Sequence, residues 1–207
     1  MTKTGASSGY LELRGAELWK GYLSRSAQED LRDAVRDVVA AAPLFSPMTR
    51  WGQPMKVRMT SAGRFGWFSD RSGYRYEARH PSGRPWPPIP EAALAIWRDV
   101  AGVPRMPECC LVNFYSDGAR MGLHQDKDEG DFEMPVVSVS LGDDALFRIG
   151  GRDRRDPTES VWLSSGDVLV LKRDSRLAYH GIDRVKPGSS TLLSNGGRIN
   201  LTLRVVT

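Results

Sequence analysis

The sequence has little cysteine and no long apolar run. Its two cysteines, Cys109 and Cys110, are adjacent, so they provide neither a disulfide framework nor the spaced pairs that bind zinc. No apolar stretch approaches the roughly 18 residues of a membrane span, and residues 1–15 lack the apolar segment of a secretory signal peptide. These absences predict a cytoplasmic protein without membrane association, in which both thiols are buried strand residues with no catalytic role.

Histidine is also scarce, since the 207 residues include only three. One of them, His80, precedes a proline in a proline-rich stretch and is expected at the surface. The chain has no internal repeat and no low-complexity block, and its length fits a single domain over 1–207. A net charge of +4 permits an anionic partner without specifying one.

Two helices are expected in the first half of the chain. Ser26 and Glu29 have the spacing of a capping box, and the apolar residues that follow recur at helical intervals up to Pro43. This pattern predicts a helix over residues 26–42. A second helix is expected to start near Pro90 and to stop at Gly102.

From about residue 109 the pattern changes to short alternating segments separated by turn residues, as in an antiparallel sandwich or barrel. No helices alternate with these segments, which argues against a doubly wound sheet. The expectation is an α+β fold, with N-terminal helices packed on a β-sandwich or jelly roll. The expected strands are 110–115, 136–141, 145–149, 161–163, 167–172, 176–180 and 198–206.

Three residues form a candidate metal site. His124 and Asp126 are two positions apart, so on extended backbone their side chains share a face. His180 lies at the end of a later expected strand, and a neighbouring strand could bring it to the same point. Two histidines and one carboxylate with open positions form the facial triad of non-haem Fe(II) oxygenases. A zinc hydrolase with the same ligand types is the competing interpretation.

The last expected strand carries two arginines on its polar face. Arg198, Asn200 and Arg204 alternate with apolar residues, and guanidinium groups bind carboxylates through paired hydrogen bonds. This pattern suits a dicarboxylate ligand, and Asn113 and Tyr115 share a face of an earlier strand in the same way. An exposed barrel face with cross-strand salt bridges is the alternative explanation of the arginines.

Five segments together resemble the AlkB family of Fe(II)- and 2-oxoglutarate-dependent dioxygenases, whose members repair alkylated nucleic acid. The resemblance covers about residues 50–205, and its most specific parts are the run from Leu123 to Glu129 and the strand from Arg198 to Arg204. The other segments are Asn113–Tyr115, Ser138–Gly142 and Tyr179–Gly181.

The resemblance implies a double-stranded β-helix (jelly-roll) core over residues 109–207. Residues 1–9 are expected to form a disordered tail, and residues 10–108 to hold the N-terminal helices and a nucleotide-recognition lid at about 50–86. The resemblance implies Fe(II) on His124, Asp126 and His180, with 2-oxoglutarate and O2 as cosubstrates. The residues implied to hold 2-oxoglutarate are Asn113, Tyr115, Arg198, Asn200 and Arg204. The residues implied on the substrate side are Met59, Trp67, Tyr74, Tyr76, Asp128, Glu129 and Arg154.

The composition of residues 50–86 fits a nucleic-acid partner. This segment holds eight basic and two acidic residues, a local charge of +6 that exceeds the charge of the whole chain. Basic residues follow a phosphate backbone, and aromatic residues stack on unpaired bases. The basic residues are Arg50, Lys56, Arg58, Arg64, Arg71, Arg75, Arg79 and Arg84. The interleaved aromatic residues are Trp51, Phe65, Trp67, Phe68, Tyr74, Tyr76 and Trp86.

The resemblance implies oxidative demethylation of 1-methyladenine and 3-methylcytosine in DNA, with single-stranded DNA as the expected form, and release of succinate, CO2 and formaldehyde. The enzyme is expected to be a monomer. An acid near the pocket, Asp128 by preference, would favour such cationic bases. The residues are also compatible with the same chemistry on RNA, on tRNA or on a protein side chain. A non-catalytic nucleic-acid-binding module on a jelly roll is compatible with them too.

Overall fold

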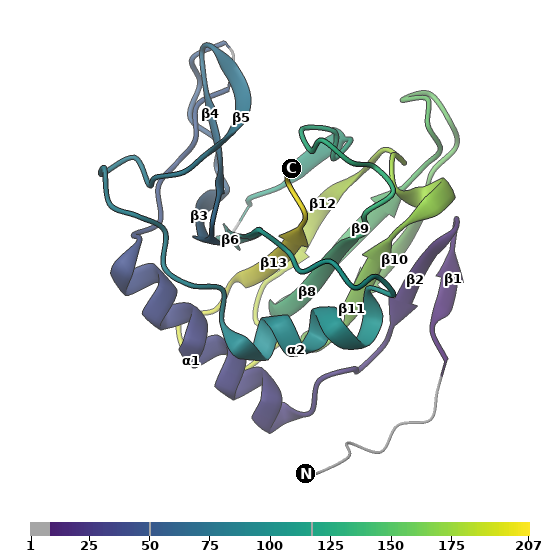
Figure 1. Cartoon of the computed structure of the whole chain (residues 1–207). Coiled ribbons are helices and arrows are strands. Elements are labelled where there is room, and N and C mark those ends of the chain that lie inside the picture. Colours follow the sequence, from purple (N-terminus) through teal and green to yellow (C-terminus); the bar gives the residue numbers. More distant parts are fainter. Residues whose placement is uncertain (1–8, 50, 117) are drawn as a thin grey trace.

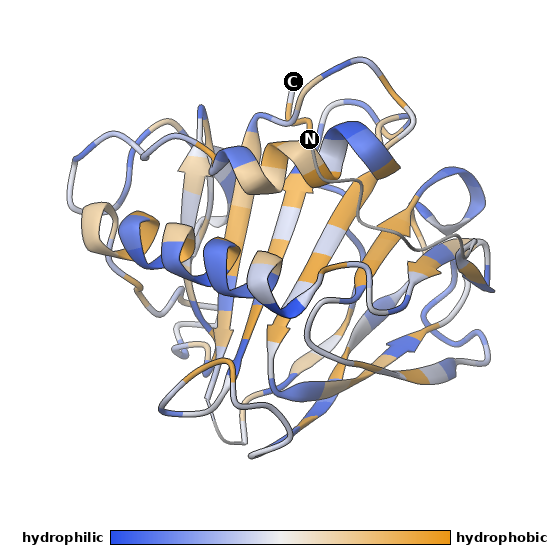
Figure 2. Cartoon of the chain, turned by 90° about the horizontal axis from the view of Figure 1, so that it is seen from below, coloured by the Kyte–Doolittle hydropathy of each residue, from blue (hydrophilic) through white to orange (hydrophobic). Residues whose placement is uncertain are grey.

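The computed structural model describes residues 9–49, 51–116 and 118–207. It contains two facing antiparallel sheets, with two helices on the outer face of the larger sheet (Figures 1 and 2). The expected disordered tail, except for Gly9, lies outside the described residues. None of the described helices is long and apolar enough to cross a membrane.

The larger sheet has seven strands in the order β1-β2-β11-β8-β13-β6-β3, and each pairs antiparallel with its neighbours. Three of its strands precede residue 64, so the core expected over residues 109–207 shares this sheet with the N-terminal part of the chain. The bounds are β1 Leu11–Leu13, β2 Ala16–Trp19, β3 Arg58–Gly63, β6 Cys109–Tyr115, β8 Val136–Gly142, β11 Val168–Leu171 and β13 Arg198–Arg204.

The smaller sheet has four strands in the order β10-β9-β12-β7, again antiparallel. These two sheets form the predicted jelly roll. A separate hairpin of β4 and β5, from the segment expected to be a lid, rises beside the open end of the sandwich (Figure 1). The bounds are β7 Met121–His124, β9 Asp144–Ile149, β10 Glu159–Leu163, β12 His180–Lys186, β4 Gly66–Asp70 and β5 Gly73–Glu77.

Both expected helices are present, as α1 (Arg25–Ala41) and α2 (Glu91–Val100). The predicted capping box is wrong, because Ser24 is the N-cap and its hydroxyl accepts the Ala27 N–H at 3.3 Å. Ser26 therefore lies inside the first turn. After α2 the chain reverses at Gly102, whose φ of +70° is accessible to glycine without strain.

Alternation along the central strands separates two environments. Leu201 and Leu203 of β13 are fully buried with Val139 of β8 in a cluster that includes Trp97 of α2 and Leu31 of α1. Both helices lie against this sheet and carry apolar and polar residues by turns along their ribbons (Figure 2). The other face of β13 consequently points between the two sheets, so its arginines do not lie on an exposed barrel face.

Two further sequence expectations are wrong. Residues 176–180 do not form a strand, because the hydroxyl of Ser175 bonds the Lys172 carbonyl and closes a short 3₁₀ helix (Arg173–Ser175), which delays β12 until His180. His80 is buried instead of exposed. Its ring nitrogens bond the Ser82 hydroxyl at 2.8 Å and the Pro43 carbonyl at 2.9 Å, which satisfies the imidazole without solvent.

Candidate metal centre and its cavity

The two site histidines face each other across neighbouring strands. His124 ends β7 and is the direct register partner of His180, the first residue of β12. This pairing needs a glycine at position 181, since a Cβ there would lie 2.5 Å from the Met121 carbonyl oxygen and 2.9 Å from that of Gly122. Asp126 lies two residues beyond β7, where the chain has left the sheet.

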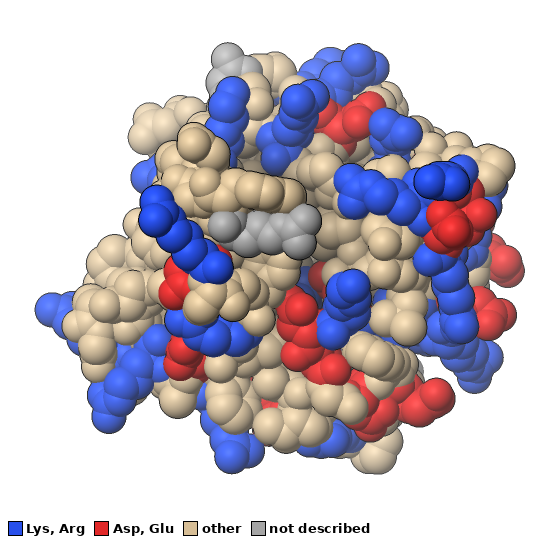
Figure 3. Space-filling view, turned by 90° about the horizontal axis from the view of Figure 1, so that it is seen from above, with Lys and Arg blue, Asp and Glu red and all other residues tan. Residues whose placement is uncertain are grey.

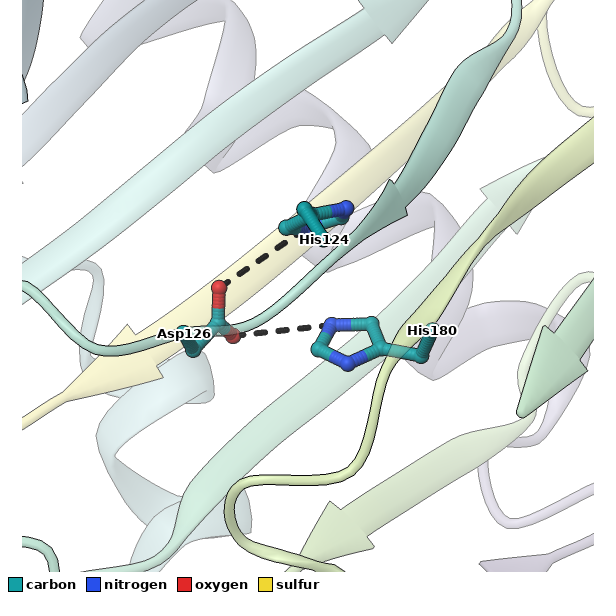
Figure 4. Close-up of side chains that lie close together, drawn as sticks. All are labelled: His124, Asp126 and His180. Carbon is teal, nitrogen blue, oxygen red and sulfur yellow. Dashed lines mark ion pairs between the residues drawn. The ribbon is translucent and has the colours of Figure 1, made fainter. Parts of the chain in front are cut away.

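The three predicted metal ligands converge (Figure 4). Asp126 Oδ1 is 3.7 Å from His124 Nε2, and its Oδ2 is 3.7 Å from His180 Nε2. The Nδ1 atoms lie 2.9 Å from the carbonyl oxygens of Gly122 and Ala178 respectively. A carbonyl only accepts, so each Nδ1 carries the proton and each Nε2 lone pair points toward the carboxylate.

Electrostatics keep this cluster in the form that binds metal. Burial opposes the charge on Asp126, but Arg204 and then His180 outweigh it and hold the pKa of that carboxyl well below its ordinary value. Burial, and next the proximity of His124, lower the pKa of His180 from 6.5 to about 4. At neutral pH the site therefore offers an ionised carboxylate and a neutral imidazole, as a metal requires.

The donor set fits iron. Ligand atoms of His124, Asp126 and His180 all lie within 4.8 Å of one another. Adjacent ligands about 2.1 Å from one ion lie about 3 Å apart, so small side-chain movements that shorten the two 3.7 Å separations would complete the site. Two imidazoles and one carboxylate, with the remaining positions open, match the facial triad of Fe(II) oxygenases.

The triad lies in a cavity of about 510 Å³ between the two sheets. Residues from both sheets and from the lid hairpin line the cavity. Its volume is large enough for a small cosubstrate beside a nucleobase. The predicted site residues that line it are Met59, Trp67, Tyr74, Asn113, Tyr115, His124, Asp126, Asp128, Arg154, His180, Arg198, Asn200 and Arg204.

Arg198 is a buried cation without a counter-ion. Its residue is 0% exposed, and its guanidinium donates to Ser140 Oγ at 2.7 Å and to the Asp143 and Leu163 carbonyls. Among the described residues no carboxylate lies within ion-pair distance, and its Nε has no hydrogen-bond partner. Burial lowers its pKa to about 10. A buried cation is costly unless an anion compensates it, so this arginine fits a ligand carboxylate.

Polar side chains surround the space next to Arg198. The buried Oδ1 of Asn113 has no partner among the described residues, and burial raises the pKa of Tyr115 to about 12. Asn200 is held by Ser138 Oγ at 2.7 Å and by the Thr202 hydroxyl at 3.0 Å. An unpaired buried acceptor calls for a ligand or water, and these groups fit 2-oxoglutarate.

Arg204 differs from Arg198 because acids surround it. Its Nη2 is 2.8 Å from Asp126 Oδ1, and its Nη1 is 3.1 Å from both Glu129 Oε1 and the Tyr76 hydroxyl. Burial opposes its charge, but Asp126, Tyr76 and Glu129 together raise its pKa well above the ordinary value. Its Nε has no partner within the described part of the chain, so one donor stays available beside the metal ligands.

Five of the seven expected substrate-side residues fall into two groups. Trp67 of β4 stacks on Tyr74 of β5 at 5.4 Å between ring centroids, and its indole donates to Asp128 Oδ2 at 2.9 Å. These three residues line the cavity, whereas Tyr76 and Glu129 are not among its lining residues. Glu129 is 5% exposed and lies behind Arg204.

The remaining two expected substrate-side residues also line the cavity. Met59 is buried in β3, where its register partner on β6 is Asn113. Arg154 donates to the Leu123 carbonyl at 2.9 Å and lies 5.8 Å from the ring centroid of Tyr179. Trp51, with 71% of its surface exposed, also lines the cavity.

The comparisons with known proteins agree with this geometry. The family model of the 2OG-Fe(II) oxygenase superfamily matches residues 15–204. An alpha-ketoglutarate-dependent dioxygenase AlkB homolog of Caulobacter vibrioides is 54% identical over 191 residues, which are 92% of this chain and 87% of the relative. The chain belongs to the AlkB family of 2OG-Fe(II) oxygenases. Its metal is therefore Fe(II) and its cosubstrates are 2-oxoglutarate and O2, as the resemblance implied.

More distant AlkB relatives match over similar lengths. The alpha-ketoglutarate-dependent dioxygenase AlkB of Escherichia coli is 40% identical over 195 residues, covering 92% of this chain and 89% of that protein. The solved structure of OsALKBH1 superposes with a TM-score of 0.80 at 32% identity and covers 95% of this chain and 98% of its own. The α+β jelly-roll fold predicted from the sequence is thus confirmed.

Sequence reasoning missed several residues that hold the site together. Ser140 anchors Arg198, and Phe147 lies 5.9 Å from His180 between ring centroids. Arg176 is buried behind the metal ligands, with 2% of its surface exposed. The sequence analysis included Arg176 only as the first residue of the strand expected over residues 176–180. An arginine at the start of a strand does not by itself indicate that the side chain is buried.

Proposed function

We propose that this chain oxidatively removes N-methyl groups from bases of nucleic acid, with 1-methyladenine and 3-methylcytosine in DNA as its main substrates. The observation that carries the proposal is that one cavity holds both the facial triad and Arg198, a buried arginine without an ion-pair partner among the described residues. Curated relatives carry matching names, including a DNA N(6)-methyladenine demethylase of Arabidopsis thaliana at 32% identity and a tRNA demethylase of Schizosaccharomyces pombe at 36% identity over 83 residues.

Each part of the cavity has a role in this reaction. His124, Asp126 and His180 would hold Fe(II), Arg198 would take one carboxylate of 2-oxoglutarate, and Arg204 contacts the metal ligand Asp126 through its Nη2. Bound Fe(II) would activate O2, so that one oxygen atom converts 2-oxoglutarate to succinate and CO2 and the other hydroxylates the N-methyl group, which then leaves as formaldehyde. The chain's other residues bind the base, orient its methyl group and exclude water.

The substrate side suits a flipped, positively charged base. Trp67 and Tyr74 offer aromatic faces for stacking, and a flipped base is read by such stacking and by hydrogen bonds to its edge. Asp128 adds a negative charge to the same wall, which favours cationic 1-methyladenine over a neutral adduct.

Basic residues around the cavity suit a phosphate backbone. Lys and Arg side chains are spread over the face that carries the lid (Figure 3). Their availability differs, because Arg75 is bound to Asp70 at 3.0 Å and also pairs with Glu77. Arg71 has no carboxylate partner among the described residues and runs beside the loop of Gly52, where a Cβ would meet its Nε at 3.0 Å.

The decisive experiment incubates anaerobically prepared enzyme with Fe(II), 2-oxoglutarate, O2 and oligonucleotides that bear 1-methyladenine, and it measures the products. The oligonucleotides are single-stranded DNA, double-stranded DNA and RNA. Succinate, formaldehyde and restored adenine should form in equal amounts, and His124→Ala should form none. Turnover without O2 would indicate a hydrolase. Turnover only with a peptide would indicate a protein hydroxylase.

A charge reversal tests the nucleic-acid partner. Arg71→Glu should raise KM for the oligonucleotide and reduce the salt dependence of binding by about one unit of slope. The matched control is Arg36→Glu on the exposed side of α1, which should change neither. Equal activity of Arg71→Glu and wild type at every salt concentration would argue against a phosphate contact at this position.

The proposal also includes a monomer that acts in the cytoplasm. Fe(II) must stay reduced for this chemistry, and the two cysteines are free thiols, which suits a reducing compartment. Analytical ultracentrifugation and cell fractionation test these two statements.

A further inference from the structure

Arg176 is a buried arginine that contacts the metal side of the site from behind. Its Nε donates to the Met134 carbonyl at 2.7 Å, and its Nη1 donates to the main-chain carbonyl of Asp126 at 2.6 Å. Its Nη2 is 3.1 Å from Glu129 Oε2, an ion pair in which the side chains are 2% and 0% exposed. Arg176 is not among the residues that line the cavity, so it reaches a ligand only through other residues.

These contacts close a ring around one metal ligand. Glu129 uses its second oxygen, Oε1, to accept from Arg204 at 3.1 Å. Arg204 in turn places its Nη2 2.8 Å from Asp126 Oδ1. Asp126 is therefore held at both ends, by Arg176 at its carbonyl and by Arg204 at its carboxylate, and Glu129 joins the two arginines.

We propose that Arg176 and Glu129 act together as a positioning pair that sets the Asp126 carboxylate and the Arg204 guanidinium for metal and 2-oxoglutarate. Asp126 needs such a device because it lies beyond the end of β7, where no strand ladder fixes its backbone. Groups behind the direct ligands orient them and tune metal affinity. The inference rests on the proposed function, since that function places Fe(II) on Asp126.

A purely structural role makes a different prediction. A buried ion pair that served only the fold would lower stability when it was removed, yet the folded fraction would bind metal as before. A positioning role requires that the folded variant binds metal more weakly. Metal affinity per folded molecule therefore separates the two roles, and it needs no turnover.

The experiment titrates metal-free protein with Mn(II) under argon and follows free Mn(II) by its EPR signal. The proteins are wild type, Arg176→Gln, Arg176→Lys and Glu129→Gln, each with its folded fraction checked by near-UV circular dichroism. Arg176→Gln and Glu129→Gln should weaken Mn(II) binding about 10- to 100-fold, and Arg176→Lys should recover part of the loss. The control is Arg98→Gln, which removes an ion pair with Glu91 on α2, on the outer face of the larger sheet, and should leave Mn(II) affinity unchanged.

A spectroscopic measurement tests the part of the proposal that concerns Arg204 and 2-oxoglutarate. Anaerobic Fe(II) with 2-oxoglutarate should give a visible charge-transfer band in wild type, and this band should shift or weaken in Arg176→Gln. The double variant Arg176→Gln/Glu129→Gln should lose less Mn(II) affinity than the product of the single losses, because both residues act in one ring.

The outcomes separate the two proposals. Failure of wild type to bind Mn(II) would reject the proposed function. Normal binding by wild type and equal binding by folded Arg176→Gln would overturn the positioning role. If Arg176→Gln does not fold, Glu129→Gln decides in its place, since it keeps the shape of the side chain, and unchanged Mn(II) affinity in that folded variant overturns the inference.

Discussion

The pKa of His180 predicts how the metal-free protein responds to acid. This pKa is about 4 in the folded protein, because of burial and then the proximity of His124, against 6.5 for an ordinary histidine. The unfolded chain therefore takes up the proton first as pH falls. The stability contribution of the neutral ring is complete above pH 6.5 and is lost as the pH falls from 6.5 to about 4. The difference corresponds to about 3 kcal/mol.

Urea unfolding in the presence of a chelator measures this effect. Wild type should lose about 3 kcal/mol of unfolding free energy between pH 7 and pH 4 beyond the loss shown by His180→Gln, which has no titrating ring. Val139→Ala is the control, because it removes apolar contacts from the core cluster and should lower both ends of the pH curve equally. Parallel curves for wild type and His180→Gln would refute the reasoning.

Three further predictions concern the cavity. Arg198→Gln should raise KM for 2-oxoglutarate at least 10-fold in steady-state kinetics, because charge-assisted hydrogen bonds are worth about 1.5–3 kcal/mol each. The KM of Arg198→Lys should lie between those of wild type and Arg198→Gln. An unchanged KM would show that Arg198 does not bind the cosubstrate. Asp128→Ala should reduce kcat/KM for 1-methyladenine more than for a neutral etheno adduct, and equal losses would contradict the electrostatic role. Gly181→Ala should lower both the melting temperature and the Mn(II) affinity, since its Cβ would lie 2.5 Å from the Met121 carbonyl oxygen. Wild-type values for both would show that β7 and β12 can move apart to accommodate a Cβ without loss of stability or of metal binding.

The sequence was informative where chemistry and local pattern coincide. The alternation along residues 198–204 predicted which side chains share a face, and the structure places that polar face in the cavity. The triad was predictable because only three histidines had to be considered. The helices were predictable because their apolar residues recur at helical intervals and because Pro43 and Gly102 end them.

Other features depend on contacts between distant segments. The burial of His80 arises from the Pro43 carbonyl, 37 residues away in the chain, and local composition does not encode that contact. Glu129 was expected on the substrate side, but Arg176 and Arg204 draw its carboxylate behind the cavity. Arg75 contributed to the basic count of the lid, yet Asp70 and Glu77 neutralise it locally. Such pairings depend on the fold and not on spacing alone.

Strand β13 has one face in the core and one in the cavity, and this arrangement limits where residues can be inserted or deleted. Leu201 and Leu203 seal the helix-facing core, while Arg198 and Arg204 point the other way into the cavity. Because side chains alternate with a period of two, one inserted or deleted residue within the strand would exchange the faces, placing charges in the core and leucines in the cavity. Next to this strand, the connection between β12 and β13, residues 187–197, can change in length because such a change leaves the strand's register intact.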